Sequence, residues 1–265
     1  MSRVLFVATD YYLEGGYASY RDFYQLVELA GYPIIPLKQL DPQSDNTYIV
    51  TPLNDEWLEG WQAPRARIIH LELEWRFGDW RAETNTPPGV AETWACDKGY
   101  ADRIGARYVP MGSDSRLCIA GNNVLKEWDV AQISYQTPRR MIVTEQMEAR
   151  GLKIAQNERL WGAARSMVLN ASELMVHVHQ TEGGKGIAPL RWCLAAAHHL
   201  PMITESVPDA GIFGHSHMRQ AEYAWLPEFV QLKLRDKREL ANYAHALHQL
   251  LCEDWTFKKM IEASI

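Results

Sequence analysis

Continuous apolar runs of strand length, separated by stretches with helical spacing, constrain the fold more than any other feature of the sequence. In the first half the runs occupy residues 3–9, 33–37, 47–52, 66–73, 91–97 and 106–112. Strands that are apolar at every position, rather than at alternate positions, are typical of a parallel sheet covered by helices on both faces. Between the first two runs, four apolar residues keep helical spacing: Phe23, Leu26, Val27 and Ala30. The pattern predicts a βαβ unit, and we expect Gly31 to end its helix.

The same alternation restarts after residues 119–128, where a glycine and two asparagines interrupt it. We expect strands at 128–135, 152–156, 171–179, 201–206 and 229–233, and helices at 139–151, 158–168, 188–200 and 237–254. The sequence therefore predicts an α/β fold in two halves joined near residue 124, with an N-terminal domain at 1–123 and a C-terminal domain at 124–265. The final segment, 255–265, is a candidate for crossing back onto the first half.

Composition and charge narrow the class of protein. The chain has 265 residues, a formal net charge of −6, and no run of about 18 apolar residues that could span a membrane. The negative charge gives no general attraction to nucleic-acid backbones, although a local basic patch stays open. Four widely spaced cysteines without a CxxC pair are expected to be reduced thiols, and the first apolar stretch is too short for a secretory signal. We therefore expect a cytoplasmic monomer or weak dimer with no transmembrane segment.

A charged, glycine-rich loop at residues 181–188 joins an apolar strand to an apolar helix. Three glycines lie in this loop: Gly183, Gly184 and Gly186. They would let backbone N–H groups approach a ligand closely, while the helix that follows offers its positive end. Lys185 adds a cation, Pro189 suits an early helical position because it lacks an N–H, and Arg191 on the first turn can bind phosphate oxygens. The combination favours a diphosphate ligand, and the alternative is a surface turn with solvated charges.

Two other phosphate-binding motifs are missing from the sequence. The residues after the first strand lack the GxGxxG spacing of dinucleotide-binding proteins, and no GxxxxGK[ST] loop occurs. Hydride transfer and ATP hydrolysis therefore lose support.

Four segments of the second half carry further motifs. They are WDVAQISYQTPRR at 128–140, MEARGLKIA at 147–155, SMVLNASELMVHVHQ at 166–180 and KGIAPLRWCLAAAHHLPMITES at 185–206. In this order and at this spacing, over roughly residues 128–250, they resemble the CgeB-like group of GT-B glycosyltransferases. The first half adds YVPMGSD at 108–114, which looks like the segment that closes the N-terminal domain in many such enzymes. The resemblance implies two Rossmann-like domains that face each other across a cleft.

The resemblance also implies a donor substrate and its position. The donor would be a nucleoside diphosphate sugar, commonly UDP-linked, held mainly by the C-terminal domain, with no cofactor bound permanently. GT-B enzymes generally need no bound metal, so basic side chains and helix dipoles would neutralise the leaving diphosphate. Lys185 and one of two adjacent arginines, Arg139 or Arg140, are the preferred diphosphate partners. The other expected donor-binding residues are Gly15, Gly16, Ser134, His177, Glu182, Gly183, Gly184, Gly186 and Arg191.

One residue departs from the pattern of these enzymes. Where they usually carry a glutamate that binds the ribose hydroxyls, three residues after the helix arginine, this chain has Leu194. Either Glu182 or Glu205 takes over that role, or the donor lies differently.

Catalytic candidates lie at strand ends of the first half. Sugar transfer with inversion requires a general base, and retention in this architecture can proceed without one. Asp10 follows the first strand beside Gly15 and Gly16, although it can equally cap a turn. His70, Glu72 and Glu74 share one face of a strand by the two-residue period. We expect this face to be exposed to the cleft, because burial of three titratable groups is costly, and a structural ion pair is the alternative.

His177 and His179 share a strand face in the same way, which could suggest a metal site. No third ligand follows at a recognisable spacing, so we expect no metal and prefer hydrogen bonding to sugar or phosphate for one histidine and packing for the other.

The sequence thus predicts a metal-independent hexosyl- or pentosyltransferase. The alternatives are a non-catalytic nucleotide or sugar binder of the same fold and a nucleotide-sugar epimerase. The acceptor is unidentified and could be a saccharide, a small molecule or a modified DNA base. Compact phage enzymes of this architecture use such a modified base as acceptor, namely a hydroxymethylated one. By analogy, a phage origin is one interpretation of the small size of this chain.

Overall fold

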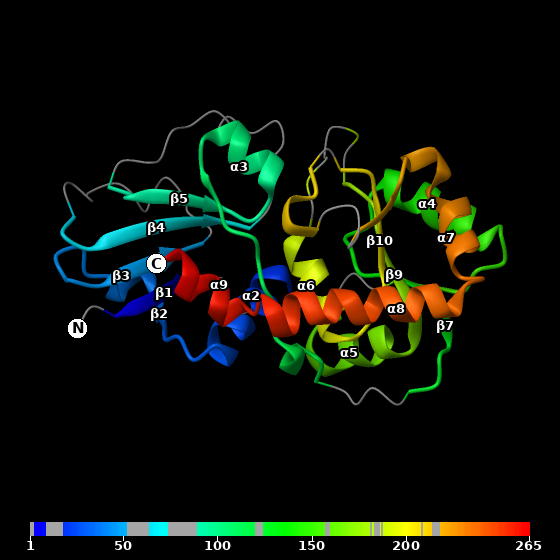
Figure 1. Cartoon of the computed structure of the whole chain (residues 1–265), viewed down its shortest axis with the longest axis horizontal. Helices are drawn as coiled ribbons and strands as arrows, with labels where there is room; N and C mark the ends of the chain where they lie inside the picture. Colours follow the sequence, from blue (N-terminus) through cyan, green and yellow to red (C-terminus); the bar gives the residue numbers. More distant parts are fainter. Residues whose placement is uncertain are drawn as a thin grey trace.

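The computed structural model describes residues 3–8, 18–51, 64–73, 89–119, 124–156, 160–180, 182, 186, 188–207, 209–213 and 218–265. Two parallel sheets form the framework, one from strands of the first half and one from strands of the second. The halves lie side by side along the longest axis of the molecule (Figure 1). The prediction of an α/β fold is confirmed.

The first sheet has the strand order β2-β1-β3-β4-β5-β6, and all neighbouring strands are parallel. Its strands are β1 (Val4–Ala8), β2 (Ile34–Pro36), β3 (Thr47–Val50), β4 (Arg67–Glu72), β5 (Glu92–Ala95) and β6 (Arg107–Tyr108). Phe6 and Val7 are consecutive in β1 and both fully buried, although they point to opposite faces. Phe6 packs in the core with helix α2 (Ala18–Leu29), and Val7 packs in a separate cluster. Burial on both faces explains the continuous apolar runs.

The second sheet has the order β11-β10-β9-β7-β8, again parallel. Its strands are β7 (Trp128–Gln132), β8 (Ile154–Gln156), β9 (Ser172–His177), β10 (Met202–Glu205) and β11 (Arg219–Ala221). One face packs against α4 (Pro138–Glu148) and α7 (Leu226–Lys233). The other packs against α5 (Gly162–Asn170), α6 (Pro189–Ala197) and α8 (Lys237–His248). In Figure 1 the strands lie between α6 on the left and α4 and α7 on the right.

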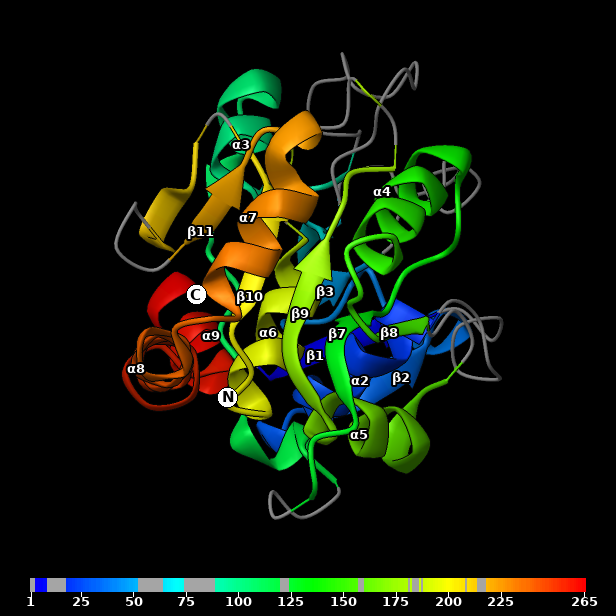
Figure 2. The same cartoon turned by 90° about the vertical axis from the view of Figure 1, so that its right-hand side faces the viewer.

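The last helices connect the second half to the first. Helix α8 runs along the long axis, so it is horizontal in Figure 1 and seen end-on in Figure 2. A π-helical turn, Gln249–Asp254, leads from it to α9 (Phe257–Ser264). Phe257 of α9 lies in the core of the first half, with its ring centroid 5.8 Å from that of Phe23. Gly112 allows this crossing, because a Cβ there would lie 2.2 Å from the carbonyl oxygen of Trp255.

Helix α6 and a buried ion pair hold the two halves together. Alternate faces of α6 pack into different cores: Leu190, Cys193 and Ala197 into the core of the first half, and Trp192, Leu194, Ala195 and Ala196 into that of the second. Beside it, Asp22 of α2 accepts hydrogen bonds from both terminal nitrogens of Arg165 in α5. The predicted boundary near residue 124 adjoins residues 120–123, which are outside the described part of the chain, so the domain limits stay a prediction.

Two local predictions differ from the structure. Residues 229–233 are not a strand but the end of α7, a helix with Pro227 in its first turn and with Leu226 and Val230 buried four residues apart. The short apolar run at 229–233 is compatible with a strand or a helix, and the four-residue spacing of buried side chains shows that it is a helix. Helix α3 (Lys98–Ile104) was not expected from the apolar pattern, although Asp97 caps it and Gly105 ends it at φ 67°.

Candidate functional site

The second sheet has a point where the strand order reverses, between β7 and β9. Strand β7 pairs with β8 on one side and β9 on the other, and the helices that follow β7 and β9 leave toward opposite faces of the sheet. Ligands of parallel α/β sheets bind at such a point, beyond the carboxyl ends of the strands. The predicted donor-binding residues Ser134, Arg139, Arg140, His177 and Arg191 lie at this edge or on the first turns of α4 and α6.

Helix α4 begins where the sequence predicts. Thr137 accepts a hydrogen bond from the backbone N–H of Arg140, and Pro138 occupies the first helical position. The buried side chain of Arg140 donates from Nε to the carbonyl oxygen of Val178 at 2.9 Å and from Nη1 to that of Tyr135 at 2.7 Å. It thereby ties the end of β9 to the loop after β7. These contacts are to the backbone, and a contact of Arg140 with a diphosphate stays a prediction.

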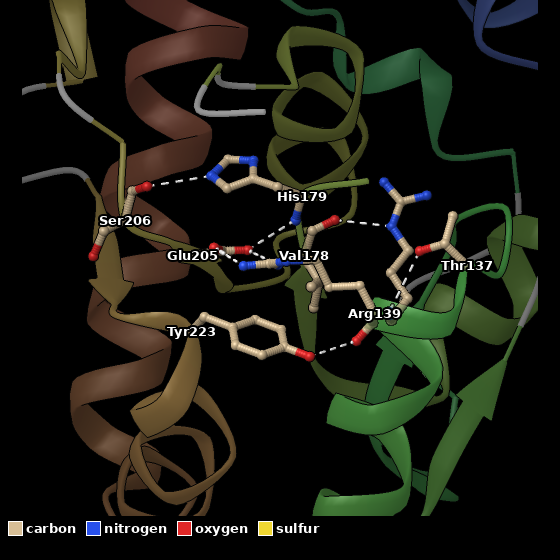
Figure 3. Close-up of polar contacts among 8 residues, drawn as sticks. Thr137, Arg139, Val178, His179, Glu205, Ser206 and Tyr223 are labelled. Carbon is tan, nitrogen blue, oxygen red and sulfur yellow. Dashed lines mark hydrogen bonds and ion pairs between the residues drawn. The ribbon is translucent and has the colours of Figure 1, made fainter. Parts of the chain in front are cut away.

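Arg139 forms an ion pair with Glu205 (Figure 3). Its two terminal nitrogens lie 2.6 and 2.5 Å from the carboxylate oxygens, and its guanidinium lies 3.7 Å from the centre of the Tyr223 ring. Glu205 also accepts from the backbone N–H of His179 at 3.1 Å, and the Tyr223 hydroxyl donates to the carbonyl oxygen of Arg139 at 2.9 Å. The pair engages two of the five N–H donors of Arg139, so it limits without excluding a contact of Arg139 with a diphosphate. A contact of Arg139 with a diphosphate and one of Glu205 with a ribose both stay predictions.

Buried polar atoms without partners mark the same edge. The hydroxyl of Ser134 and the amide nitrogen of Gln132 are buried and form no hydrogen bond in the described part of the chain. On β10, the Thr204 hydroxyl is in the same situation. Buried polar groups are nearly always hydrogen-bonded, so these three atoms are exceptions among the described residues. The donor-binding role of Ser134 stays a prediction.

His177, at the end of β9, contacts Arg191 of α6. Nη1 of Arg191 lies 2.7 Å from Nδ1 of the buried His177 ring. Burial, and after it the charge of Arg191, holds the pKa of His177 well below its usual range. Gly186 is buried and Glu182 is exposed, whereas Gly183, Gly184 and Lys185 lie outside the described residues. The predicted diphosphate loop therefore stays a prediction.

His179 lies close to His177, with ring centroids 5.4 Å apart and planes nearly perpendicular. Its Nε2 is 3.2 Å from the carbonyl oxygen of Ser206, and burial lowers its pKa (Figure 3). Among the described residues, no group of three or more His, Cys, Asp or Glu side chains is placed to hold a metal ion. The two rings pack against each other because residues two positions apart lie on the same side of an extended chain.

In the first half, the expected exposure of the β4 face is wrong for His70 and Glu72. Both are buried, at 6% and 8% exposure, and Nε2 of His70 lies 3.1 Å from a carboxylate oxygen of Glu72. This contact fits the structural alternative for the pair, although Nε2 of His70 forms no hydrogen bond in the described part of the chain. A catalytic role for Glu72 stays a prediction. The other first-half candidates lie outside the described residues: Asp10, Gly15, Gly16 and Glu74.

Two further residues shape the site. Leu194, at the position of the expected ribose glutamate, is only 3% exposed and packs in the core of the second half. Tyr223 was missed by sequence reasoning, because it lies 84 positions from the arginine that it covers. No local pattern predicts so distant a contact.

Comparison with protein-family models and with curated proteins gives no match. Solved structures do match. AviGT4, a glycosyltransferase involved in avilamycin A biosynthesis, superposes with a TM-score of 0.65 at 11% identity over 100% of this chain and 96% of that chain. Sucrose-phosphate synthase from Thermosynechococcus elongatus gives 0.57 at 9% identity over 100% and 98%. The T4 phage β-glucosyltransferase bound to its UDP-glucose substrate gives 0.54 at 10% identity over 100% and 99%.

These matches confirm the predicted fold class, the GT-B architecture of two Rossmann-like domains. At this level of identity they carry the fold alone, and membership of the CgeB-like group stays a prediction. Among the described helices, none is both long and apolar enough to cross a membrane.

Proposed function

We propose that the protein transfers a sugar from a nucleoside diphosphate sugar, with UDP as the expected nucleotide, to an acceptor hydroxyl. The observation that carries the proposal is the edge where β7 and β9 end. Arg191 and the amino ends of α4 and α6 lie at this edge, on a fold shared with a phage glucosyltransferase whose structure holds UDP-glucose. The amino end of a helix and an arginine are the groups that bind a diphosphate without a metal.

In the transfer step, the bond between the anomeric carbon and the diphosphate oxygen breaks, and a bond from that carbon to the acceptor oxygen forms. Negative charge builds up on the leaving diphosphate, so Arg191 and the helix ends would stabilise the transition state more than the ground state. The acceptor proton leaves to a base, for which Asp10, Glu72 and Glu74 are the candidates. The buried pair of Glu72 with His70 makes Glu72 the weakest of the three.

The acceptor is proposed as a class only. A saccharide, a small molecule and a modified DNA base are all compatible with the fold, and one of the matching structures belongs to a DNA-modifying β-glucosyltransferase. A DNA acceptor would require a local basic surface on a chain of net charge −6, and its binding would weaken steeply as salt increases.

Calorimetric titration with UDP, GDP, TDP, ADP and CMP tests the donor site first. We expect one diphosphate to bind, and the Arg191→Ala variant to bind it about 1–3 kcal/mol more weakly, the usual contribution of a charge-assisted contact. The exposed Arg235 provides a matched control, because Arg235→Ala removes the same charge from the surface after α7. If no nucleotide binds, or if both variants bind equally well, the proposed site is wrong.

Turnover then separates the three functional classes. A glycosyltransferase releases UDP from the UDP-sugar and attaches the sugar to an acceptor, an epimerase converts the donor without any acceptor, and a non-catalytic binder does neither. UDP release with a panel of saccharides and hydroxymethylated DNA identifies a transferase, and analysis of the recovered donor for a converted sugar separates an epimerase from a binder.

A further inference from the structure

The contact between His177 and Arg191 joins a buried ring to a more exposed cation. His177 is the last residue of β9 and only 4% exposed, whereas Arg191 is the third residue of α6 and partly exposed. Pro189 fixes the first turn of α6, and Arg191 thereby lies over the end of the neighbouring strand. The two nitrogen atoms, Nδ1 and Nη1, are 2.7 Å apart, a full hydrogen bond.

The chemistry of arginine decides which nitrogen donates. A guanidinium keeps its protons in proteins and has no acceptor, so Nδ1 of His177 must accept. The His177 ring is therefore neutral, with its proton on Nε2. His179 provides a contrast two residues away, because its Nε2 faces the carbonyl oxygen of Ser206, and that contact suits a neutral and a protonated ring equally.

The charged surroundings of His177 favour the same state. Arg191 from α6, Arg140 from α4 and His179 from its own segment all act against a proton on the ring, in addition to burial. Protonation of His177 would turn the acceptor for Arg191 into a second donor and break the contact.

We propose that His177 is a positioning residue, whose neutral Nδ1 holds the guanidinium of Arg191 in place for the donor diphosphate. This inference rests on the proposed function, in which Arg191 binds that diphosphate. An arginine that is already held by its neighbour loses less rotamer freedom on binding than one that rotates freely. His177 then acts on affinity through Arg191 and need not touch the donor itself.

Paired substitutions of His177 test the role of the acceptor. His177→Asn keeps an acceptor, since its amide oxygen can take the place of Nδ1, whereas His177→Leu removes it. We expect His177→Leu to weaken binding of UDP, or of the diphosphate that wins the nucleotide screen, about tenfold, and His177→Asn to stay within about threefold of wild type. In turnover the loss should appear mainly in KM for the donor, and Arg191→Met with His177→Leu should be no weaker than Arg191→Met alone. Equal affinity of His177→Leu and wild type overturns the inference.

Nitrogen-15 NMR of the histidine rings tests the contact without any nucleotide. The wild-type protein should show His177 as the neutral Nε2–H form at pH 7 and still at pH 5.5. In Arg191→Met the signal of Nδ1 should change, and the ring should titrate at a higher pH than in wild type. A wild-type ring that is half protonated near pH 6.5, or one that Arg191→Met leaves unchanged, overturns the inference. His179 provides the internal reference in the same spectra.

The outcomes also separate this inference from the proposed function. If the wild-type protein binds no nucleoside diphosphate, the proposed function fails, and with it the purpose assigned to His177. If the wild type binds and His177→Leu binds equally, only the inference fails. Should His177→Leu prove unfolded by circular dichroism, Arg191→Met still decides through the NMR measurement, because a His177 ring that ignores Arg191 contradicts the proposal.

Discussion

Removal of one partner of the Asp22–Arg165 ion pair should destabilise the protein far more than removal of both. The side chains are 5% and 7% exposed, and Nη1 of Arg165 lies 2.9 Å from the second carboxylate oxygen of Asp22. Burial raises the pKa of Asp22 even though Arg165 opposes it, so the attraction does not fully offset the cost of removing the carboxylate from water. A charge left alone in this place costs about 3–5 kcal/mol, whereas an apolar pair of similar volume costs little or even stabilises.

Urea denaturation of three variants measures this difference. Asp22→Leu and Arg165→Met should each lower the free energy of unfolding by about 3–5 kcal/mol, and the double variant should lie close to wild type. In Arg165→Met the pKa of Asp22 should rise further, so its loss of stability should grow as the pH rises above the ordinary carboxyl value of 3.8. Glu262→Ala, which breaks an exposed pair with Lys258, is the control and should change stability little.

The contrary result is equally clear. If both single variants cost less than about 1 kcal/mol, the carboxylate and guanidinium are solvated, and α2 and α5 do not pack as described. If the double variant loses as much as the sum of the single ones, the two side chains act independently.

Three further predictions concern pH, packing and the donor site. Burial lowers the pKa of His198 from 6.5 to about 4. The free energy of unfolding should therefore fall by up to about 3 kcal/mol as the pH decreases from 6.5 toward 4, because the unfolded state takes up the proton first. In urea titrations at several pH values, His198→Gln should reduce this dependence of stability on pH. Gly112→Ala should lower the free energy of unfolding by more than about 2 kcal/mol in thermal unfolding, because its Cβ would overlap backbone atoms. Gly31→Ala is the control: its Cβ meets open space at φ 83°, so it should cost about 1 kcal/mol. Equal losses of stability would contradict the close approach at Gly112. Lys185→Ala, like Arg191→Ala, should weaken diphosphate binding by about 1–3 kcal/mol in calorimetry with the fold intact, and unchanged affinity in both would remove the donor site.

The sequence predicts the framework well because burial on both faces leaves a strong local signal. The runs around Phe6, Ile49 and Val176 are largely apolar on both faces of the sheet and become inner strands. The start of α4 also has a local signal, because Thr137 caps the helix and Pro138 occupies its first position. Short elements carry less information: the run at 229–233 has too few residues to separate a strand from the end of a helix, and its assignment was wrong.

The candidate site was predictable in its location and less so in its contacts. Gly-rich spacing and helix starts place Arg139, Arg140 and Arg191 at the carboxyl edge of the second sheet, and they lie there. Their partners come from distant positions, such as Glu205 for Arg139, and such pairings depend on strand order rather than on local pattern. The burial of Glu72 escaped prediction for the same reason, because the groups that cover a strand end are remote in sequence.

Helix α6 has one more consequence. Seven of its nine residues pack into two different cores, with Cys193 in that of the first half and Trp192 in that of the second. Rotation of one half relative to the other would expose one of these sets of apolar side chains to water. We therefore expect α6 to keep the two halves in a fixed orientation. Arg191 lies one residue before Trp192, so we expect substitutions that displace α6 from either core to alter donor affinity, and random mutagenesis should recover them as well as changes beside the nucleotide.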